Sequence, residues 1–280
     1  MTFTKMHGLG NDYVYVNTFV ERVEDAPALA RDVSDRHRGI GSDGLILIAP
    51  PGRGDADVRM EMYNADGSRG QMCGNGIRCV AKYAHDHGLS KSNPLRVATD
   101  SGVLTLALTV GGDGKVQTVR VDMGEPILDP QRIPVSLGGE RAVNQPLPLR
   151  EAILSMTCVS MGNPHAVMFV ESLDEVPLHQ WGPQVERHAL FPQRVNAHWV
   201  QVVSREHVRM VTWERGSGPT QACGTGAAAV CVAAVLNRLT DRKITATLPG
   251  GDLLLEWVEA SNHVFKTGPA TEVFTGQWPG

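Results

Sequence analysis

Hydrophobic residues along the chain form short runs that predict strands, interrupted by two longer runs that predict buried helices. The segments Ile77–His87 and Ala227–Asn237 are apolar on nearly every side, so each is expected to be a helix in the middle of its domain. Outer helices are predicted at Ala26–Asp35 and Leu178–His188. Runs that alternate, or are continuously apolar and rich in β-branched residues, predict strands. These strands are Tyr13–Phe19, Leu45–Ala49, Val58–Tyr63, Val103–Val110, Val116–Met123, Leu154–Met161, Ala166–Val170, Trp199–Val203, Val208–Trp213, Ile244–Leu248, Leu253–Val258 and Thr271–Thr275.

Two glycine-rich boxes, each containing a cysteine, indicate an internal duplication. Met72-Cys73-Gly74-Asn75-Gly76 and Ala222-Cys223-Gly224-Thr225-Gly226 each lead into one of the two apolar helices. Their cysteines are 223 − 73 = 150 residues apart, and Asn64 and Glu214 each lie nine residues before the cysteine of their half. A constant separation of this kind is typical of a repeated structural unit.

The duplication predicts two copies of one α/β plan. We expect two pseudo-symmetric domains of α+β class, each a mixed, mainly antiparallel sheet wrapped around its own central helix. The junction Gly124-Glu125-Pro126 places the first domain at residues 1–124 and the second at 125–268, and the last strand, within residues 269–280, is expected to complete the first domain. Both helix N-termini would then point at one cleft, with the two thiols face to face.

Composition limits the classes of partner. The 26 basic and 30 acidic residues give a formal charge of −4 and are spread along the chain, and aromatic residues are few, so nucleic acid is not expected as a partner. The longest apolar stretch, Gly226 to Leu236, is far shorter than the roughly 20 residues of a membrane-spanning helix. With no basic and apolar leader at its N-terminus, the chain is expected to be a soluble, cytoplasmic protein.

Five cysteines, an odd number, fit a reducing compartment better than a disulfide framework. Cys79, Cys158 and Cys231 lie in apolar surroundings and are expected to be small buried side chains. The spacings Cys73…Cys79 and Cys223…Cys231 are wider than those of structural zinc pairs, so no metal is expected. The chain also has no phosphate loop, no dinucleotide fingerprint and no feature that requires pyridoxal phosphate, so no organic cofactor is expected.

The remaining two cysteines are the best candidates for catalysis. At the start of a helix, unpaired N–H groups and the helix dipole are expected to lower the pKa of each thiol. Two facing thiols, one of them ionised, can remove a proton from one face of a carbon and return one to the other face, as a racemase or epimerase requires. Backbone N–H groups of Gly74-Asn75 and Gly224-Thr225 are suited to hold the substrate carboxylate as negative charge develops.

Polar residues in parallel positions predict a binding site for an amino acid. Asn11 and Asn163 are 152 residues apart, and with Asn64 and Asn196 they stand at predicted strand ends, where an amide can both donate and accept. Each asparagine by itself is equally explained as a turn residue. The pair Glu214-Arg215 adds a carboxylate and a guanidinium that could grip a second carboxylate, although an isolated pair would be read as a surface ion pair.

With these motifs in order, the chain resembles the diaminopimelate epimerase family over nearly its whole length. No single box is specific, but eight segments in this order are. They are Phe3-Thr4-Lys5-Met6-His7-Gly8-Leu9-Gly10-Asn11-Asp12, Arg38-Gly39-Ile40-Gly41-Ser42-Asp43-Gly44, Tyr63-Asn64-Ala65-Asp66-Gly67-Ser68, Met72-Cys73-Gly74-Asn75-Gly76-Ile77-Arg78-Cys79, Gly162-Asn163-Pro164-His165, Arg194-Val195-Asn196, Glu214-Arg215-Gly216 and Ala222-Cys223-Gly224-Thr225-Gly226.

The resemblance implies cofactor-independent interconversion of L,L- and meso-diaminopimelate, a precursor of lysine and peptidoglycan, by an isomerase with Cys73 and Cys223 as its acid/base pair. It also implies a homodimer. His165 and Glu214 would help tune the thiols, or His165 would be a histidine satisfied after the Asn-Pro turn. The residues that would bind substrate, its distal L-configured head included, are Asn11, Asn64, Gly74, Asn75, Asn163, Asn196, Glu214, Arg215, Gly224 and Thr225.

Two positions depart from the family pattern, and three other functions remain open. Pro219 stands where many members carry an acid, and Gly44 where some carry a ligand-contacting Gln. A proline or hydroxyproline racemase shares paired cysteines, but its first box typically has His where this chain has Asn75. A phenazine-biosynthesis-type isomerase shares the implied fold and lacks the thiol pair. A binding or redox-sensing protein with a reversible Cys73–Cys223 disulfide would leave the asparagines without a role.

Overall fold

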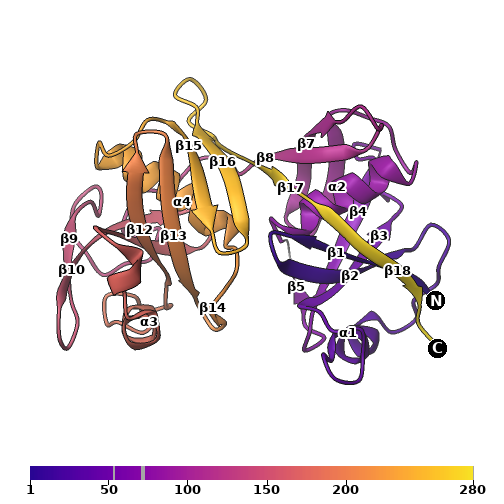
Figure 1. Ribbon diagram of the computed structural model, residues 1–280, viewed down its shortest axis with the longest axis horizontal. Helices are drawn as coiled ribbons and strands as arrows, with labels where there is room; N and C mark the ends of the chain where they lie inside the picture. The colour runs from indigo at the N-terminus through magenta and orange to yellow at the C-terminus, as the bar shows by residue number, and fades with distance from the viewer. Residues whose placement is uncertain (53, 71–72, 280) are drawn as a thin grey trace. The chain divides into compact units, whose positions relative to one another are not determined.

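The computed structural model describes residues 1–52, 54–70 and 73–279 and divides into two compact units (Figure 1). The first unit comprises Met1–Val121 with Thr267–Gly280, and the second comprises Asp122–Lys266. Met72, the first residue of the first cysteine box, lies outside the described residues. Each unit has its own set of paired strands and its own buried helix, which agrees with the fold class expected from the sequence.

The first unit consists of a mixed sheet with one outer and one central helix. Its helices are α1 (Ala26–Ser34) and α2 (Gly76–Asp86). Its strands are β1 (Thr2–Gly8), β2 (Asn11–Asn17), β3 (Gly44–Ala49), β4 (Val58–Asn64), β5 (Arg69–Gly70), β6 (Leu95–Thr99), β7 (Gly102–Val110), β8 (Val116–Asp122) and β18 (Thr271–Gln277). The last strand of the chain, β18, pairs antiparallel with β1.

The second unit repeats this plan. Its helices are α3 (Leu178–Glu186), α4 (Gly224–Leu236) and a short 3-10 helix, Leu173–Glu175. Its strands are β9 (Gln145–Pro148), β10 (Ile153–Ser160), β11 (Pro164–Val170), β12 (Asn196–Ser204), β13 (His207–Glu214), β14 (Gly218–Pro219), β15 (Lys243–Leu248), β16 (Gly251–Trp257) and β17 (Val264–Pro269). Of these, β17 crosses the boundary between the two units.

The duplication extends to the register of the strands. The parallel pair β2–β3 aligns Tyr15 with Ile46, and the parallel pair β11–β12 aligns Val167 with His198. Both alignments shift by 152 residues, since 167 − 15 and 198 − 46 are equal. The sequence order antiparallel, parallel, antiparallel recurs in β1–β2–β3–β4 and β10–β11–β12–β13. Residues 152 apart near the strand starts therefore occupy equivalent places in the two units.

Both central helices are buried, as expected, but only α4 is apolar throughout, because α2 also buries Arg78, Lys82 and His85. Every residue of α4 from Gly226 to Ala234 is buried, and α4 packs against β10, β11, β12, β15 and β16. The cysteines Cys79, Cys158 and Cys231, expected to be buried, are each at most 2% exposed. Burial in water-poor surroundings raises the pKa of Cys158 and of Cys231 to about 12.

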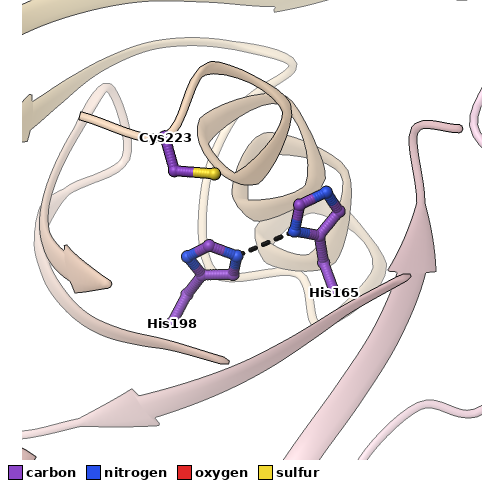
Figure 2. Close-up of side chains that lie close together, drawn as sticks. All are labelled: His165, His198 and Cys223. Atoms are coloured by element: carbon purple, nitrogen blue, oxygen red, sulfur yellow. Dashed lines mark hydrogen bonds between the residues drawn. The ribbon is translucent and has the colours of Figure 1, made fainter. Parts of the chain in front are cut away.

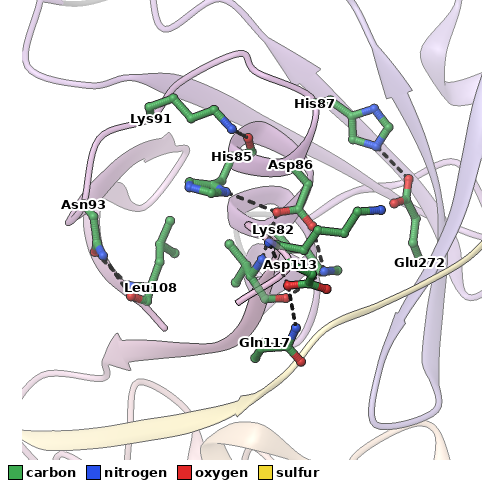
Figure 3. A network of polar contacts seen from close by, with 12 residues as sticks. Lys82, His85, Asp86, His87, Lys91, Asn93, Leu108, Asp113, Gln117 and Glu272 are labelled. Carbon is green, nitrogen blue, oxygen red and sulfur yellow. Dashed lines mark hydrogen bonds and ion pairs between the residues drawn. The ribbon is translucent and has the colours of Figure 1, made fainter. Parts of the chain in front are cut away.

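The central helix of the first unit also buries polar side chains near its C-terminal end, and a network of polar contacts satisfies them (Figure 3). Asp86 accepts from Lys82 Nζ at 2.7 Å and from the Val116 backbone N–H at 2.9 Å. The Lys82 ammonium also donates to the Val116 carbonyl, which ties α2 to β8. Burial opposes ionisation of Asp86, but these hydrogen bonds outweigh it and lower the pKa of the carboxyl.

The sequence prediction differs from the structure at strands that lack a clear period. Strands β1, β6, β9 and β17 and the two-residue strands β5 and β14 were not predicted. In β1, Phe3 to Met6 are all buried, Thr4 and Lys5 included, so the strand shows no alternation of polar and apolar residues. In the described part of the chain, no helix combines the length and the hydropathy needed to cross a membrane.

Candidate active site

In the second unit, Cys223 caps the N-terminus of α4. Its backbone is extended, with φ −109° and ψ 104°, and its side chain makes no capping hydrogen bond. The side chain is only 3% exposed, and Sγ lies 3.8 Å from the Thr225 hydroxyl. A Cβ added to Gly226 would lie 3.0 Å from Cys223 Sγ and 2.2 Å from His198 Cε1. Only glycine at this position allows the first turn of α4 to contact the His198 imidazole so closely.

The expectation that a helix start lowers the pKa of this thiol is wrong for Cys223. Burial raises its pKa well above the ordinary value, and the nearby Glu214 carboxylate raises it further. Hydrogen bonds from the Gly226 N–H and from Thr225 act in the opposite direction and are outweighed. In this unit the thiol form of Cys223 is therefore the favoured one, because desolvation outweighs the hydrogen bonds at the helix start.

A chain of hydrogen bonds runs beneath Cys223 through two buried histidines (Figure 2). His198 Nε2 and His165 Nδ1 are 2.9 Å apart, and both rings are fully buried. At the inner end, His198 Nδ1 lies 2.9 Å from the Thr212 hydroxyl. At the outer end, His165 Nε2 lies 2.9 Å from Asn163 Oδ1, and Asn163 is half-buried.

One set of proton positions satisfies every bond of this chain. With Asn163 Oδ1 as an acceptor, His165 Nε2 carries the proton and Nδ1 offers a lone pair. His198 then donates through Nε2, and its Nδ1 accepts from the Thr212 hydroxyl. Both rings are neutral, because burial lowers the pKa of His198 to about 3 and, with the neighbouring His198 and Arg215, lowers that of His165 well below its usual value.

The other polar groups expected in this half surround the ends of strands β11, β12 and β13. Asn196 is buried and accepts from the Arg215 backbone N–H at 2.9 Å, while its amide donates to the Pro164 carbonyl at 3.0 Å. Thr220 donates to the Glu214 carboxylate at 2.6 Å, beside the short antiparallel pair that β13 makes with β14. The bonds of Asn196 thus make it a support for the backbone around the site.

An open pocket of about 350 Å³ lies beside these strand ends in the second unit. Asn163 and Arg215, both expected as substrate ligands, line it together, and Arg215 is exposed. The Arg215 side chain donates to the Gln193 carbonyl at 3.0 Å. The full lining is Gln131, Arg132, Ile133, Pro134, Ser160, Gly162, Asn163, Pro164, Gln193 and Arg215.

In the first unit, Cys73 lies just before α2 and is half-buried. Its thiol donates to Asn11 Oδ1 at 3.3 Å, and the Gly76 N–H donates to its sulfur at 3.4 Å. The Asn11 amide in turn donates to Asp43 at 2.6 Å. Cys73 and Asn11, both expected in the site, are therefore in direct contact, and the hydroxyl of Tyr13 also interacts with the Cys73 side chain.

A buried arginine holds the loop between Cys73 and α2. Arg78 is fully buried, and its Nη1 donates to the Gly74 carbonyl and to Asn75 Oδ1, each at 3.0 Å. Its Nε donates to the Pro269 carbonyl at 3.0 Å. The side-chain oxygen of Asn75, expected to face substrate, is thus engaged by Arg78. The position equivalent to Arg78 in the second unit, 150 residues later, is Ala228.

Two further expectations concern the loops of the first unit. Asn64 ends β4, and its amide donates to the Ser68 hydroxyl at 2.9 Å, so it organises the following turn. A Cβ at Gly44 would lie 2.2 Å from the Tyr63 carbonyl oxygen. A side chain cannot be placed at Gly44 without moving this backbone.

Sequence reasoning missed His198, Thr212, Thr220, Tyr13 and Arg78. His198 could have been found by comparing the two halves of the sequence. The residue 152 positions earlier is Ile46, and a histidine in place of an isoleucine is a notable change. Within its own strand His198 shows nothing unusual. Its importance comes from the contact with His165, which belongs to a different strand.

Comparison with known families and proteins identifies close relatives of the whole chain. The model of the family described as Diaminopimelate epimerase matches residues 3–128 and 157–273. A diaminopimelate epimerase of Acetivibrio thermocellus is 55% identical over 277 residues, covering 99% of this chain and 98% of that protein. One of Methanococcus maripaludis is 47% identical, covering 99% of each chain.

More distant solved structures share the fold. A probable proline racemase from Agrobacterium radiobacter K84 superposes with a TM-score of 0.72 at 14% identity, covering 99% of this chain and 92% of that one. A phenazine biosynthesis protein of the PhzF family from Bacillus anthracis gives 0.70 at 14% identity, covering 99% and 98%. At this identity the similarity shows a common architecture, and it separates neither the substrates nor the reactions of these proteins.

Proposed function

The chain belongs to the diaminopimelate epimerase family, and from that premise we propose that it interconverts L,L- and meso-diaminopimelate with Cys73 and Cys223 as the acid/base pair. The observation that supports this most strongly is the duplication, which puts a cysteine at the start of the central helix in each unit. Family membership makes the protein an isomerase of amino acids. The route would serve lysine and peptidoglycan precursor synthesis without a cofactor.

In the proposed reaction one thiolate removes the α-proton, and the other thiol delivers its own proton to the opposite face of the carbanion. The electron pair of the broken C–H bond passes to the α-carbon and its carboxylate and then forms the new C–H bond. At the end the two thiols have exchanged protonation states. The raised pKa of Cys223 supports Cys223 as the proton donor in the resting enzyme, which leaves Cys73 as the first base.

The polar groups around each thiol have distinct proposed roles. N–H groups at the helix starts, near Gly74-Asn75 and Gly224-Thr225, would stabilise the charge on the reacting carboxylate. Asn11, Asn64, Asn163, Asn196, Glu214 and Arg215 would bind the rest of the substrate, with Arg215 and Asn163 doing so from the pocket they line. His165 would orient Asn163, since its ring bonds directly to that amide.

Two further features of the family are part of this proposal. Formation of a homodimer is supported by the exposure of Val273 (54%) and Phe274 (48%) on β18, and light scattering of the purified protein tests it. A cytoplasmic location is supported by the five free cysteines, which the reaction would need in reduced form. Cell fractionation tests the location.

Proton NMR in D₂O tests the activity directly. The reduced protein should exchange the α-proton of L,L-diaminopimelate and form the meso isomer, while L-proline run in parallel should remain unchanged. Cys73→Ser and Cys223→Ser should each lower turnover by about 10²–10⁴-fold, the range expected for loss of a general acid or base. Cys231→Ser is the matched control, because Cys231 lies on α4 and its thiol donates to the Arg242 carbonyl.

Inversion of proline instead of diaminopimelate would assign the protein to the racemases. Near-normal turnover in either catalytic variant would contradict the acid/base assignment. Full activity with a Cys73–Cys223 disulfide in place would contradict it as well, because neither sulfur could then carry a proton.

A further inference from the structure

Two histidines and a cysteine meet in the second unit with their potential metal-binding atoms close together (Figure 2). His165 comes from β11, His198 from β12, and Cys223 from the start of α4. One ligand atom of each lies within 4.8 Å of the others, and all three residues are buried. Imidazole nitrogen and thiolate sulfur are the donors that Zn²⁺ and similar divalent metals prefer.

The equivalent positions of the first unit show that this fold does not require the histidines. Residues 152 positions earlier are Tyr13 and Ile46, beside Cys73 in the equivalent box. There the first turn of α2 packs against an isoleucine, since a Cβ on Gly76 would lie 2.6 Å from Ile46 Cδ1. Burial of an imidazole instead of a hydrocarbon costs free energy of desolvation, so His198 calls for a reason other than packing.

We propose that His165, His198 and Cys223 form a binding site for one Zn²⁺ ion per chain, in addition to the acid/base role proposed for Cys223. In tetrahedral zinc sites, bond lengths of 2.0–2.3 Å put neighbouring ligand atoms about 3.3–3.6 Å apart. The nitrogens of His165 and His198, now 2.9 Å apart, would open by a few tenths of an ångström. The sulfur, which lies at most 4.8 Å from the nitrogens, would close by roughly 1.2 Å at most to reach the same spacing.

The protons balance with one released per metal ion. His165 already directs the lone pair of Nδ1 at the site, because Nε2–H donates to Asn163. His198 moves its proton from Nε2 to Nδ1, where the Thr212 hydroxyl turns to accept it. Cys223 loses its thiol proton to solvent and binds as thiolate. Each histidine then keeps a hydrogen bond from its second nitrogen, as metal-bound histidines usually do.

Metal binding at this site would inhibit the enzyme. This inhibitory role rests on the proposed epimerase function. A metal-bound thiolate can neither donate nor accept the substrate proton, so Zn²⁺ would stop turnover without denaturing the protein. The metal-binding step itself does not depend on that function. Its measurement remains informative even if the protein does not epimerise diaminopimelate.

Cobalt(II) is the probe, because its absorption reports both thiolate ligation and coordination number. The reduced, metal-free protein should take up one Co²⁺ per chain, with a thiolate-to-cobalt charge-transfer band and the visible bands of a four-coordinate ion whose fourth ligand is a water molecule. Zn²⁺ should displace it and abolish the bands. His198→Gln should weaken Co²⁺ binding by at least about a hundredfold, since loss of an outer partner alone costs up to that much.

His207→Gln is the matched control. His207 lies in the same unit and also contacts a threonine hydroxyl, that of Thr247 at 2.9 Å, on another part of the sheet. This variant should bind Co²⁺ as the wild type does. Absence of the thiolate band, or equal Co²⁺ binding by wild type and His198→Gln, would overturn the proposal. Zn²⁺ inhibition that persists unchanged in His198→Gln would refute the inhibitory role.

Discussion

Acidification from pH 7 to pH 5 should destabilise the second unit through His198, and His198→Gln should remove this part of the loss. The pKa of His198 is lowered to about 3 by burial, whereas an unfolded histidine titrates near 6.5. The folded state therefore binds fewer protons than the unfolded state in this window. For a group shifted in this direction, stability is complete above pH 6.5 and is lost as pH falls toward 3.

The magnitude follows from these two pKa values. At pH 5 an unfolded histidine is almost fully protonated, while His198 in the folded protein stays neutral. The difference in free energy of unfolding between pH 7 and pH 5 is then about 2 kcal/mol for this one side chain. His165 is shifted in the same direction and adds to the loss, so the wild type should lose more than 2 kcal/mol.

Urea unfolding followed by tryptophan fluorescence measures this loss in the appropriate unit. Four of the five tryptophans, Trp181, Trp199, Trp213 and Trp257, belong to the second unit, and Trp199 is fully buried next to His198. The experiment includes a chelator, so that metal bound to His198 does not contribute. His207→Gln serves again as the control and should keep the wild-type dependence on pH.

In His198→Gln the glutamine amide can still bond to His165 and Thr212 but does not titrate. Its loss between pH 7 and pH 5 should be smaller than that of the wild type by about 2 kcal/mol. An equal loss in the two proteins would refute the reasoning, because the acid sensitivity would then arise elsewhere.

Three other substitutions test separate parts of the structure. Gly226→Ala should lower both melting temperature and turnover, at a cost of about 1–3 kcal/mol, because its Cβ would press on His198 and Cys223. Asp86→Asn should destabilise the first unit by about 3 kcal/mol, measured by hydrogen exchange in α2, because Lys82 loses its buried partner. Arg215→Ala should raise KM for diaminopimelate about tenfold to hundredfold, which corresponds to a charged hydrogen bond of about 1.5–3 kcal/mol. Unchanged melting, unchanged exchange and unchanged KM, respectively, would contradict these expectations.

The sequence predicted the buried helices well, because their signal is local. The apolar run that begins at Ala227 is buried as expected, and the outer helices start at the predicted residues, Ala26 and Leu178. Strand β1 was not predicted because Phe3 to Met6 are all buried, which means that both faces of the strand are covered. Its alternation is therefore lost. Of its two partners, β2 follows directly in the chain, but β18 lies at the other end.

For the site, the sequence located the groups that stand in motifs and missed those that depend on packing. Cys73 and Asn11, expected from their boxes, are in contact. His198 was not predicted because a lone histidine in a strand has no distinctive spacing. The direction of the pKa shift of Cys223 was wrong for a related reason, since the helix dipole can be read from the sequence but the depth of burial cannot.

The pairing of β18 with β1 also affects the order in which the protein can fold during synthesis. The first unit contains the first residues of the chain and also its last strand, and the amino group of Met1 donates to the Trp278 carbonyl at 2.9 Å. A ribosome therefore releases all of the second unit before the sheet around Cys73 can close. Loss of the final ten residues would damage the half of the protein that was made first and leave the later half with its sheet complete.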